Sequence, residues 1–410
     1  MTIYENIDEN AILNAALSCA HCSMCYQTLP SLTMSNKFAD ICPSGLYFNF
    51  EAYYSPGRNE IARAILQDEF KLEDSKKLQE IIYSCTTCGA CEANCRYVND
   101  DNVLPVHITE AIRAILNQKG LKPMPNQIKF AEQTKILNNP YGESGERNSW
   151  LLNKMKGKNK KAKYFYFVGC TSGYRLKNIA EATFNILQHL KEDFTLSSSE
   201  ICCGSPLIRT GQLEDIPRLV NENIKIIQNS RAKEVIFSCA GCYRTVTFDW
   251  PHIYGKELPF KTIHMTEYLA EKVKKNKLKF KTPLHMTVAY HDPCHLGRHM
   301  FPNQIYEEPR YVIDQIPGIE RITLDREMDS TLCCGAGGGV KAGLPEYSEY
   351  IASLRVQEVR EKGADTIITP CPFCIRGLSD GAKKESIESG NNRIAVIGLT
   401  ELVNKAMGGN

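Results

Sequence analysis

The cysteines in the last third of the chain stand in three groups, each beside a residue that turns the backbone. The five members are Cys294, Cys333, Cys334, Cys371 and Cys374. Two adjacent cysteines cannot easily form a disulfide with each other. A following glycine, here Gly335, lets the backbone turn tightly, so both thiols can point at one metal centre. A buried structural cysteine is usually single and inert, so this spacing predicts metal binding.

The same pattern occurs once before, which indicates an internal duplication. Its members are Cys170, Cys202, Cys203, Cys239 and Cys242. The first, second and fourth cysteines of the two copies are 124, 131 and 132 residues apart. We therefore expect two equivalent sites that face each other across a pseudo-twofold axis.

Two closely spaced cysteine runs precede these sites and resemble the bacterial two-cluster ferredoxin pattern. In that pattern, three close thiolates hold most of one [4Fe-4S] cube and a remote cysteine completes the other cube. The resemblance implies a first cubane on Cys19, Cys22, Cys25 and Cys95. It implies a second cubane on Cys85, Cys88, Cys91 and Cys42.

The chain departs from the ferredoxin pattern in two places. Sixteen residues separate Cys25 from Cys42, where the pattern has three, so a loop is inserted. Arg96 follows Cys95 in place of proline. The alternative is two zinc sites of four cysteines each, but zinc ribbons use pairs of C-x-x-C rather than triplets. The two departures therefore weaken the predicted pairing but not the number of ligands, and the triplet spacing favours iron-sulfur clusters over zinc.

Composition places the chain among soluble globular proteins. Of its 410 residues 43% are hydrophobic and 23% charged, and a net charge of +2 gives no reason to expect nucleic acid as a partner. No apolar run approaches the roughly eighteen residues of a membrane span, and the polar start of the chain is unlike a secretory signal. The 18 cysteines, grouped in this way, favour metal ligation in a reducing compartment over disulfides. We expect a cytoplasmic protein from an anaerobe, attached to the inner face of a membrane only through a partner.

The elements expected around the cysteines define an α+β fold. Residues 1–120 indicate a small helical, ferredoxin-like domain, and the proline-broken stretch 121–163 indicates a linker. A first α/β domain is expected over 164–280 and a second over 281–410. Their parallel strands at 164–168, 234–237, 286–290 and 366–368 end close before a cysteine, where open α/β sheets place their ligands.

Nearly the whole chain resembles the iron-sulfur subunits that join a two-cluster ferredoxin domain to a pair of CCG domains. The resemblance is carried by the cysteine groups, by the run from His291 to Arg298 (HDPCHLGR), and by Asn139-Pro140-Tyr141-Gly142 in the linker. The D subunit of heterodisulfide reductase is nearest in layout. Relatives include the glycolate oxidase iron-sulfur subunit and subunits that serve benzoyl-CoA reductase or electron-transfer flavoprotein complexes.

The resemblance implies that each five-cysteine set holds a non-cubane [4Fe-4S] cluster. One cluster would lie on Cys170, Cys202, Cys203, Cys239 and Cys242, and the other on Cys294, Cys333, Cys334, Cys371 and Cys374. Electrons would pass through the two cubanes to these clusters, between which a disulfide such as a heterodisulfide is reduced. Three histidines that flank Cys294 are candidate catalytic proton donors, or else structural imidazoles: His291, His295 and His299.

No flavin or nucleotide motif is visible, because the glycine tract 335–339 follows a Cys-Cys pair rather than a strand and indicates close packing near a cluster. Electrons must therefore come from, or go to, other subunits of an oxidoreductase complex, which would be flavin-, quinone- or haem-linked. The second hypothesis is a non-catalytic conduit between a flavin- or quinone-linked partner and another oxidoreductase subunit. The same cysteines serve both functions, and iron analysis would separate both from a structural zinc protein.

Overall fold

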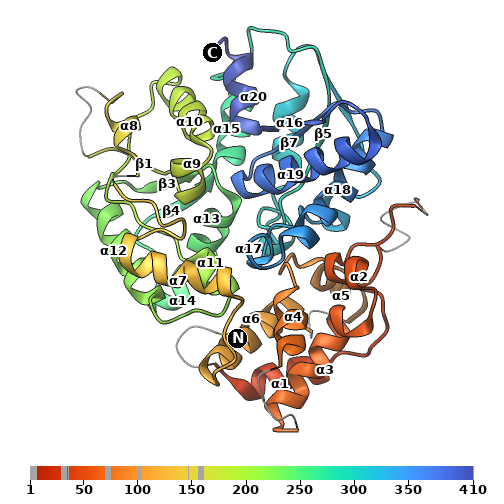
Figure 1. Cartoon of the computed structure of the whole chain (residues 1–410). Coiled ribbons are helices and arrows are strands. Elements are labelled where there is room, and N and C mark those ends of the chain that lie inside the picture. Colours follow the sequence, from red (N-terminus) through yellow and green to blue (C-terminus); the bar gives the residue numbers. More distant parts are fainter. Residues whose placement is uncertain are drawn as a thin grey trace.

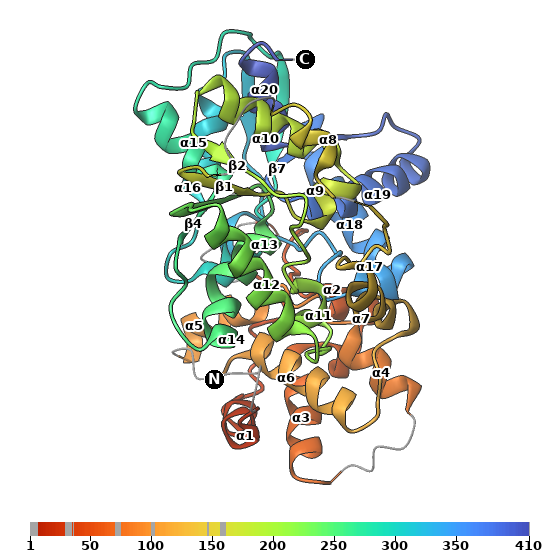
Figure 2. The same ribbon diagram turned by 90° about the vertical axis from the view of Figure 1, so that its left-hand side faces the viewer.

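The chain folds into two α/β lobes that stand side by side above a helical part (Figure 1). This computed structural model describes residues 7–28, 35, 37–69, 75–99, 103–145, 147–155 and 161–409. Residues 1–6 at the start of the expected helical domain, and 156–160 near the end of the expected linker, lie outside the described residues. Figure 2, a view from the side, shows the helical part at one end of the molecule and the C-terminus at the other.

Short helices make up the N-terminal part, with the cysteines at or near their ends. They are α1 (Glu9–Leu17), α2 (Pro43–Phe48), α3 (Ser55–Leu66), α4 (Lys76–Tyr83), α5 (Ala90–Asn99) and α6 (Pro105–Gln118). The central helix is α6, which is buried along most of its length and contacts α1, α3, α4 and α5. Three of these helices, α2, α3 and α6, have proline in the first turn, where the missing N–H leaves no hydrogen bond unmade.

The stretch expected to be a linker contains two helices and packs against both lobes. They are α7 (Pro125–Leu137) and α8 (Ser149–Leu152). The α7 helix contacts α11 (Ser205–Arg209) of the first lobe and α17 (Val340–Gly343) of the second. Its buried Gln127 donates a hydrogen bond of 3.1 Å to the carbonyl of Gly339. This stretch therefore braces the lobes instead of running freely between them.

Each lobe contains a four-stranded parallel sheet, and the strand order is the same in both. The first sheet runs β2 (Phe194–Thr195), β1 (Tyr164–Phe167), β3 (Glu234–Phe237), β4 (Lys261–His264). The second runs β6 (Ile319–Ile322), β5 (Met286–Tyr290), β7 (Thr366–Thr369), β8 (Ala395–Gly398). The two inner strands of each sheet are adjacent, so the cysteine loops that follow them leave the sheet at the same edge.

Helices cover the sheets, and two pairs of them join the lobes. The first lobe has α9 (Cys170–Tyr174), α10 (Lys177–His189), α11 (Ser205–Arg209), α12 (Ile216–Asn229), α13 (Ala240–Arg244), α14 (Trp250–Tyr254) and α15 (Met265–Lys274). The second has α16 (Glu307–Asp314), α17 (Val340–Gly343), α18 (Pro345–Glu361), α19 (Pro372–Ser389) and α20 (Leu399–Ala406). The α10 helix packs against α20, and its counterpart α16 packs against α15. Such reciprocal contacts are those of a twofold relation, as the sequence repeat predicts.

Candidate metal centre

All ten cysteines of the duplicated pattern line one cavity of about 390 Å³. They lie in the loops at the carboxyl edges of the two sheets or in the first turns of the helices that follow. The structure thus brings these predicted residues together, and the two sets face each other as expected. A volume of this size is typical of cofactor and small-molecule sites.

Hydrogen bonds between thiols join neighbouring members of each set. In the first set, hydrogen bonds with Cys202 and Cys242 lower the pKa of Cys203 to about 6. In the second set, hydrogen bonds with Cys333 and Cys374 hold the pKa of Cys334, the counterpart of Cys203, well below its ordinary value. Each set therefore contains a thiol that ionises readily, and the thiolate is the form that binds metal.

Two further thiol contacts are made by the second set, one with the first set and one with the helical part. Cys239 of the first set hydrogen-bonds with Cys371 of the second. Cys88, from the helical part, hydrogen-bonds with Cys333. The second set therefore lies between the helical part and the first set, an order that the sequence did not predict.

Cys42, Cys85, Cys88 and Cys91 line a separate cavity of about 20 Å³ in the helical part. This is the grouping implied by the ferredoxin resemblance. Burial, followed by negative charge on Cys85 and Cys88, raises the pKa of Cys91 well above its ordinary value. The buried guanidinium of Arg58 lies at the same cavity and acts in the opposite direction on the pKa of Cys91.

The other predicted N-terminal set adjoins this one through Cys25. Burial raises the pKa of Cys25, and negative charge on Cys91, Cys42 and Cys19 adds to the effect. Cys19 is a predicted partner of Cys25, whereas Cys91 and Cys42 belong to the neighbouring set. Two adjacent centres are therefore consistent with this arrangement.

Asn94 holds the loop around Cys25 against α5. Its side-chain amide donates hydrogen bonds to the carbonyls of Met24, at 2.8 Å, and Gln27, at 2.7 Å. Cys95 is the next residue of α5, so the contact links the ends of the predicted Cys19, Cys22, Cys25 and Cys95 set. Cys22 is exposed, which places this end of the cysteine series at the surface.

The donor chemistry fits iron-sulfur clusters. All 18 cysteines are free of disulfides, and the described residues that line the large cavity include no Asp or Glu. Thiolates are the donors that such clusters use. Buried thiols this close to one another cannot all ionise unless a cation offsets their charge. A cluster in each set would satisfy that requirement.

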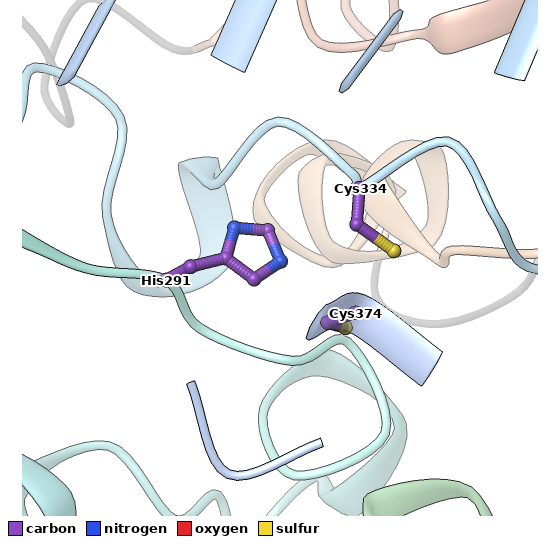
Figure 3. A group of neighbouring side chains, drawn as sticks. All are labelled: His291, Cys334 and Cys374. Atoms are coloured by element: carbon purple, nitrogen blue, oxygen red, sulfur yellow. The ribbon is translucent and has the colours of Figure 1, made fainter. Parts of the chain in front are cut away.

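The three predicted histidines occupy different places, and only His295 lines the large cavity. His291 lies behind Cys334 and Cys374, close enough to group its ring nitrogen with their sulfurs (Figure 3). Burial lowers the pKa of His291 to about 3 and holds the pKa of His295 and His299 well below the ordinary value. The rings of His295 and His299 pack edge to face, and His299 Nε2 lies 2.9 Å from the carbonyl of Thr87.

One wall of the cavity carries basic and hydroxyl groups outside the predicted site residues. Arg376 and Lys341 lie there, and Lys341 pairs with Asp380. Arg376 donates a hydrogen bond of 3.1 Å to the Tyr141 hydroxyl, which also lies 2.9 Å from the Thr171 hydroxyl. Tyr141 belongs to the Asn-Pro-Tyr-Gly motif noted in the sequence. The position of Tyr141 at the cavity, however, depends on contacts between segments far apart in the sequence.

Arg147 also lies beside the cysteines, and no sequence motif singles it out. Its guanidinium is buried, lies 3.1 Å from the sulfur of Cys170, and pairs with Glu200 at 2.8 Å. Glu200 in turn accepts hydrogen bonds from the backbone N–H groups of Val168 and Gly169. Cys294, the counterpart of Cys170, has the positive charge of buried Arg298 nearby, but no side-chain hydrogen bond to its sulfur is described. The two sets therefore differ in their electrostatic surroundings.

The glycine tract, predicted to pack closely near a cluster, packs against the loop of the helical part that carries Cys85. A Cβ atom at Gly337 would lie 2.6 Å from the carbonyl oxygen of Thr86, and one at Gly338 would overlap the carbonyl oxygen of Cys85. Side chains are therefore excluded where the second lobe meets the loop that carries Cys85 and Cys88.

Family comparisons divide the chain in the same way as its structure. Residues 15–98 match a 4Fe-4S dicluster domain, and residues 164–247 and 288–379 match the CCG cysteine-rich domain. A crystal structure of a hypothetical protein from Helicobacter pylori has a similar fold, with a TM-score of 0.52, 13% identity, and coverage of 77% of this chain and 59% of that one.

The curated relatives include subunits of oxidoreductases and one protein that is itself named an oxidoreductase. The D subunit of the dihydromethanophenazine:CoB–CoM heterodisulfide reductase of Methanosarcina barkeri is 37% identical, over 95% of this chain and 94% of that protein. The B subunit of the fumarate reductase (CoM/CoB) of Methanothermobacter marburgensis is 31% identical, over 95% of this chain and 72% of that protein. EtfAB:quinone oxidoreductase of Syntrophomonas wolfei is 27% identical, over 95% of this chain and 58% of that protein.

Proposed function

Because this chain belongs to the family of CCG-domain iron-sulfur proteins that includes the D subunit of heterodisulfide reductase, we propose that it takes up electrons in its helical part and reduces a disulfide between its two α/β lobes. Electron transfer by an iron-sulfur subunit of an oxidoreductase is common to this group of relatives. Disulfide reduction by this chain is the further step that we propose.

The observation that carries the proposal is the single cavity lined by both five-cysteine sets. Reduction of a disulfide needs two electrons and two protons, RS–SR′ + 2 e⁻ + 2 H⁺ → RSH + R′SH. When bound, non-cubane clusters on the two sets would each supply one electron, and cubanes on the two N-terminal sets would deliver them. An S–S bond that opens between the facing cysteine sets would then have one centre beside each sulfur.

The contact between Cys88 and Cys333 supports a direction for this transfer. It makes the second lobe the side of the cavity nearest to the helical part, while the exposed Cys22 lies at the far end of the cysteine series. We therefore place the electron-donating subunit, which would be flavin-, quinone- or haem-linked, against the helical part near Cys22. None of the described helices combines the length and the apolar character of a membrane span.

The cavity wall supports an acidic substituent on the disulfide. Arg376 lies on it without a carboxylate partner among the described residues, whereas the charge of Lys341 is offset by Asp380. Of the three histidines predicted to donate protons, only His295 lines the cavity, where its neutral ring would relay protons from water to the thiolates. His291 and His299 pack behind the cysteines and would hold their loops.

Iron analysis and EPR spectroscopy test the proposal. The chain, purified without oxygen, is titrated with reductant in the presence and absence of a thiol such as 2-mercaptoethanol. We expect about sixteen irons per chain and a paramagnetic signal that requires the thiol. If the irons are present but no thiol or disulfide alters any signal, the chain is instead a conduit between other oxidoreductase subunits. Bound zinc in place of iron would refute both functions.

A further inference from the structure

Tyr141 connects the two lobes directly at the cavity. It belongs to the stretch between the helical part and the first lobe, and its side chain lines the cavity beside Thr171 and Arg376. Its hydroxyl lies 2.9 Å from the hydroxyl of Thr171, which follows Cys170 in the first lobe. Arg376, two residues after Cys374 in the second lobe, donates to the same hydroxyl at 3.1 Å. The phenol therefore lies between elements that carry the two cysteine sets.

These contacts leave the Tyr141 proton free to act. The oxygen accepts from Arg376, so the hydroxyl hydrogen points either at Thr171 or into the cavity. Thr171 can take either role, since a hydroxyl both donates and accepts. If Thr171 turns its own hydrogen toward the tyrosine oxygen, the phenol can donate to a bound molecule without losing a partner. Burial raises the pKa of Tyr141, so the group keeps its proton.

Charge on the neighbouring residues strengthens this donor. Arg376 stands over the Tyr141 ring, with its guanidinium carbon 5.6 Å from the ring centre. Among the described residues Arg376 has no carboxylate partner, whereas Arg175, which also contacts the ring, pairs with Glu143. A hydrogen bond from a cation to the phenol oxygen polarises the O–H bond toward an acceptor. The arrangement suits a negative charge that appears only during reaction.

We propose that Tyr141 is a catalytic residue for disulfide reduction, which donates a hydrogen bond to the sulfur that gains negative charge as the S–S bond opens. This inference rests on the proposed function. As two electrons enter RS–SR′, the bond between the sulfurs breaks and each sulfur leaves with a full set of electron pairs. The Tyr141 proton is shared with one sulfur and is not consumed, and both thiols obtain their protons from water. Oxidised reductant and two thiols are the only products.

The test compares Tyr141→Phe with the unaltered chain, using reduced methyl viologen as electron donor and neutral 2-hydroxyethyl disulfide as substrate. The neutral substrate excludes any contribution from attraction of an acidic group to Arg376. We expect kcat to fall about 100-fold, the usual loss when one donor to a developing charge is removed. KM should change little, because the donor acts after binding. Tyr174→Phe is the matched control, since Tyr174 is a neighbouring tyrosine that does not line the cavity.

A measurement independent of turnover accompanies the kinetics. In Tyr141→Phe, at unchanged iron content, a higher 2-mercaptoethanol concentration should be needed to reach half of the thiol-dependent EPR signal. The reason is that the variant has no phenol hydroxyl to donate to the thiol sulfur. Unchanged kcat together with an unchanged thiol midpoint would refute the role of Tyr141 while leaving disulfide reduction intact. Absence of both turnover and thiol-dependent signal in the unaltered chain would refute the proposed function, and with it this inference.

Discussion

At the scale of single residues, the two cysteine sets differ most at Arg147. Its positive charge and its hydrogen bond to Cys170 stabilise negative charge on the first set, whereas Cys294 has the charge of buried Arg298 nearby but no described hydrogen bond from it. Hydrogen bonds to cluster sulfurs and nearby cations raise a reduction potential. The first set is therefore expected to be the better electron acceptor, which agrees with its place furthest from the helical part.

Arg147→Gln should consequently lower the midpoint potential of one paramagnetic centre and leave the others in place. A redox titration followed by EPR measures this directly. Arg321→Gln is the matched control, because Arg321 pairs with Asp314 at the surface, away from the cavity. If all potentials stay where they are in Arg147→Gln at full iron content, the asymmetry between the sets has another origin.

Arg376 should select for acidic substrates. We compare Arg376→Met with the unaltered chain on dithiodiglycolate, which carries two carboxylates, and on neutral 2-hydroxyethyl disulfide. The ratio of the two kcat/KM values should fall about tenfold, since a hydrogen bond to a charged group contributes about 1.5–3 kcal/mol. Both rates should also decline if Arg376 polarises Tyr141. Arg393→Met, on the exposed surface, is the control, and an unchanged ratio would argue against an acidic substituent on the substrate.

At the scale of elements, the loop that carries Cys22 and Cys25 depends on one side chain of α5. Asn94→Ala removes both hydrogen bonds that hold this loop, and leaves the carbonyls of Met24 and Gln27 without those donors. We expect the loss of about four irons per chain, with the remaining signals intact. Iron and sulfide quantitation measures the result. Asn221→Ala, on the exposed side of α12, removes a hydrogen bond of similar length and should retain all irons. Full iron content in Asn94→Ala would show that cluster binding does not depend on these two hydrogen bonds.

The elements were also what the sequence predicted best. The strands expected at 234–237 and 286–290 coincide with β3 and β5, and the other two differ from β1 and β7 by one residue. Apolar runs of four or five residues that are bounded by turn residues are too short for a typical helix, and this favours a buried strand. The stretch 121–163 was harder, since its prolines suggest a linker while Pro125 in fact begins α7. The exact domain boundaries stay predictions.

At the scale of the whole molecule, the cysteine sets form one series because the three parts share buried polar contacts. Arg113 of α6 is fully buried and donates to the carbonyls of Cys85, Arg209 and Gly338. These carbonyls belong to the helical part, the first lobe and the second lobe. A single guanidinium thus fixes the relative positions of all three parts around the cysteines.

Long-range contacts of this kind explain what the sequence could not predict. The repeat offsets indicated two facing sites, and the cysteine types indicated the metal donors. The order of the sets, set by Cys88 against Cys333 and Cys239 against Cys371, depends on docking between segments more than a hundred residues apart. Tyr141, Arg147 and Arg376 lie in no recognisable metal motif and become neighbours of the cysteines only in the folded chain. The three histidines looked equivalent in sequence, yet only His295 lines the cavity.

The most direct test of the central claim is EPR-monitored redox titration of the anaerobically purified chain with its iron content known, repeated with and without 2-mercaptoethanol. Disulfide reduction between two five-cysteine sets predicts about sixteen irons and a new paramagnetic signal that appears only with the thiol. About eight irons and spectra that the thiol leaves unchanged would contradict it, because the cavity between the lobes would then hold no centre to which a substrate sulfur could bind.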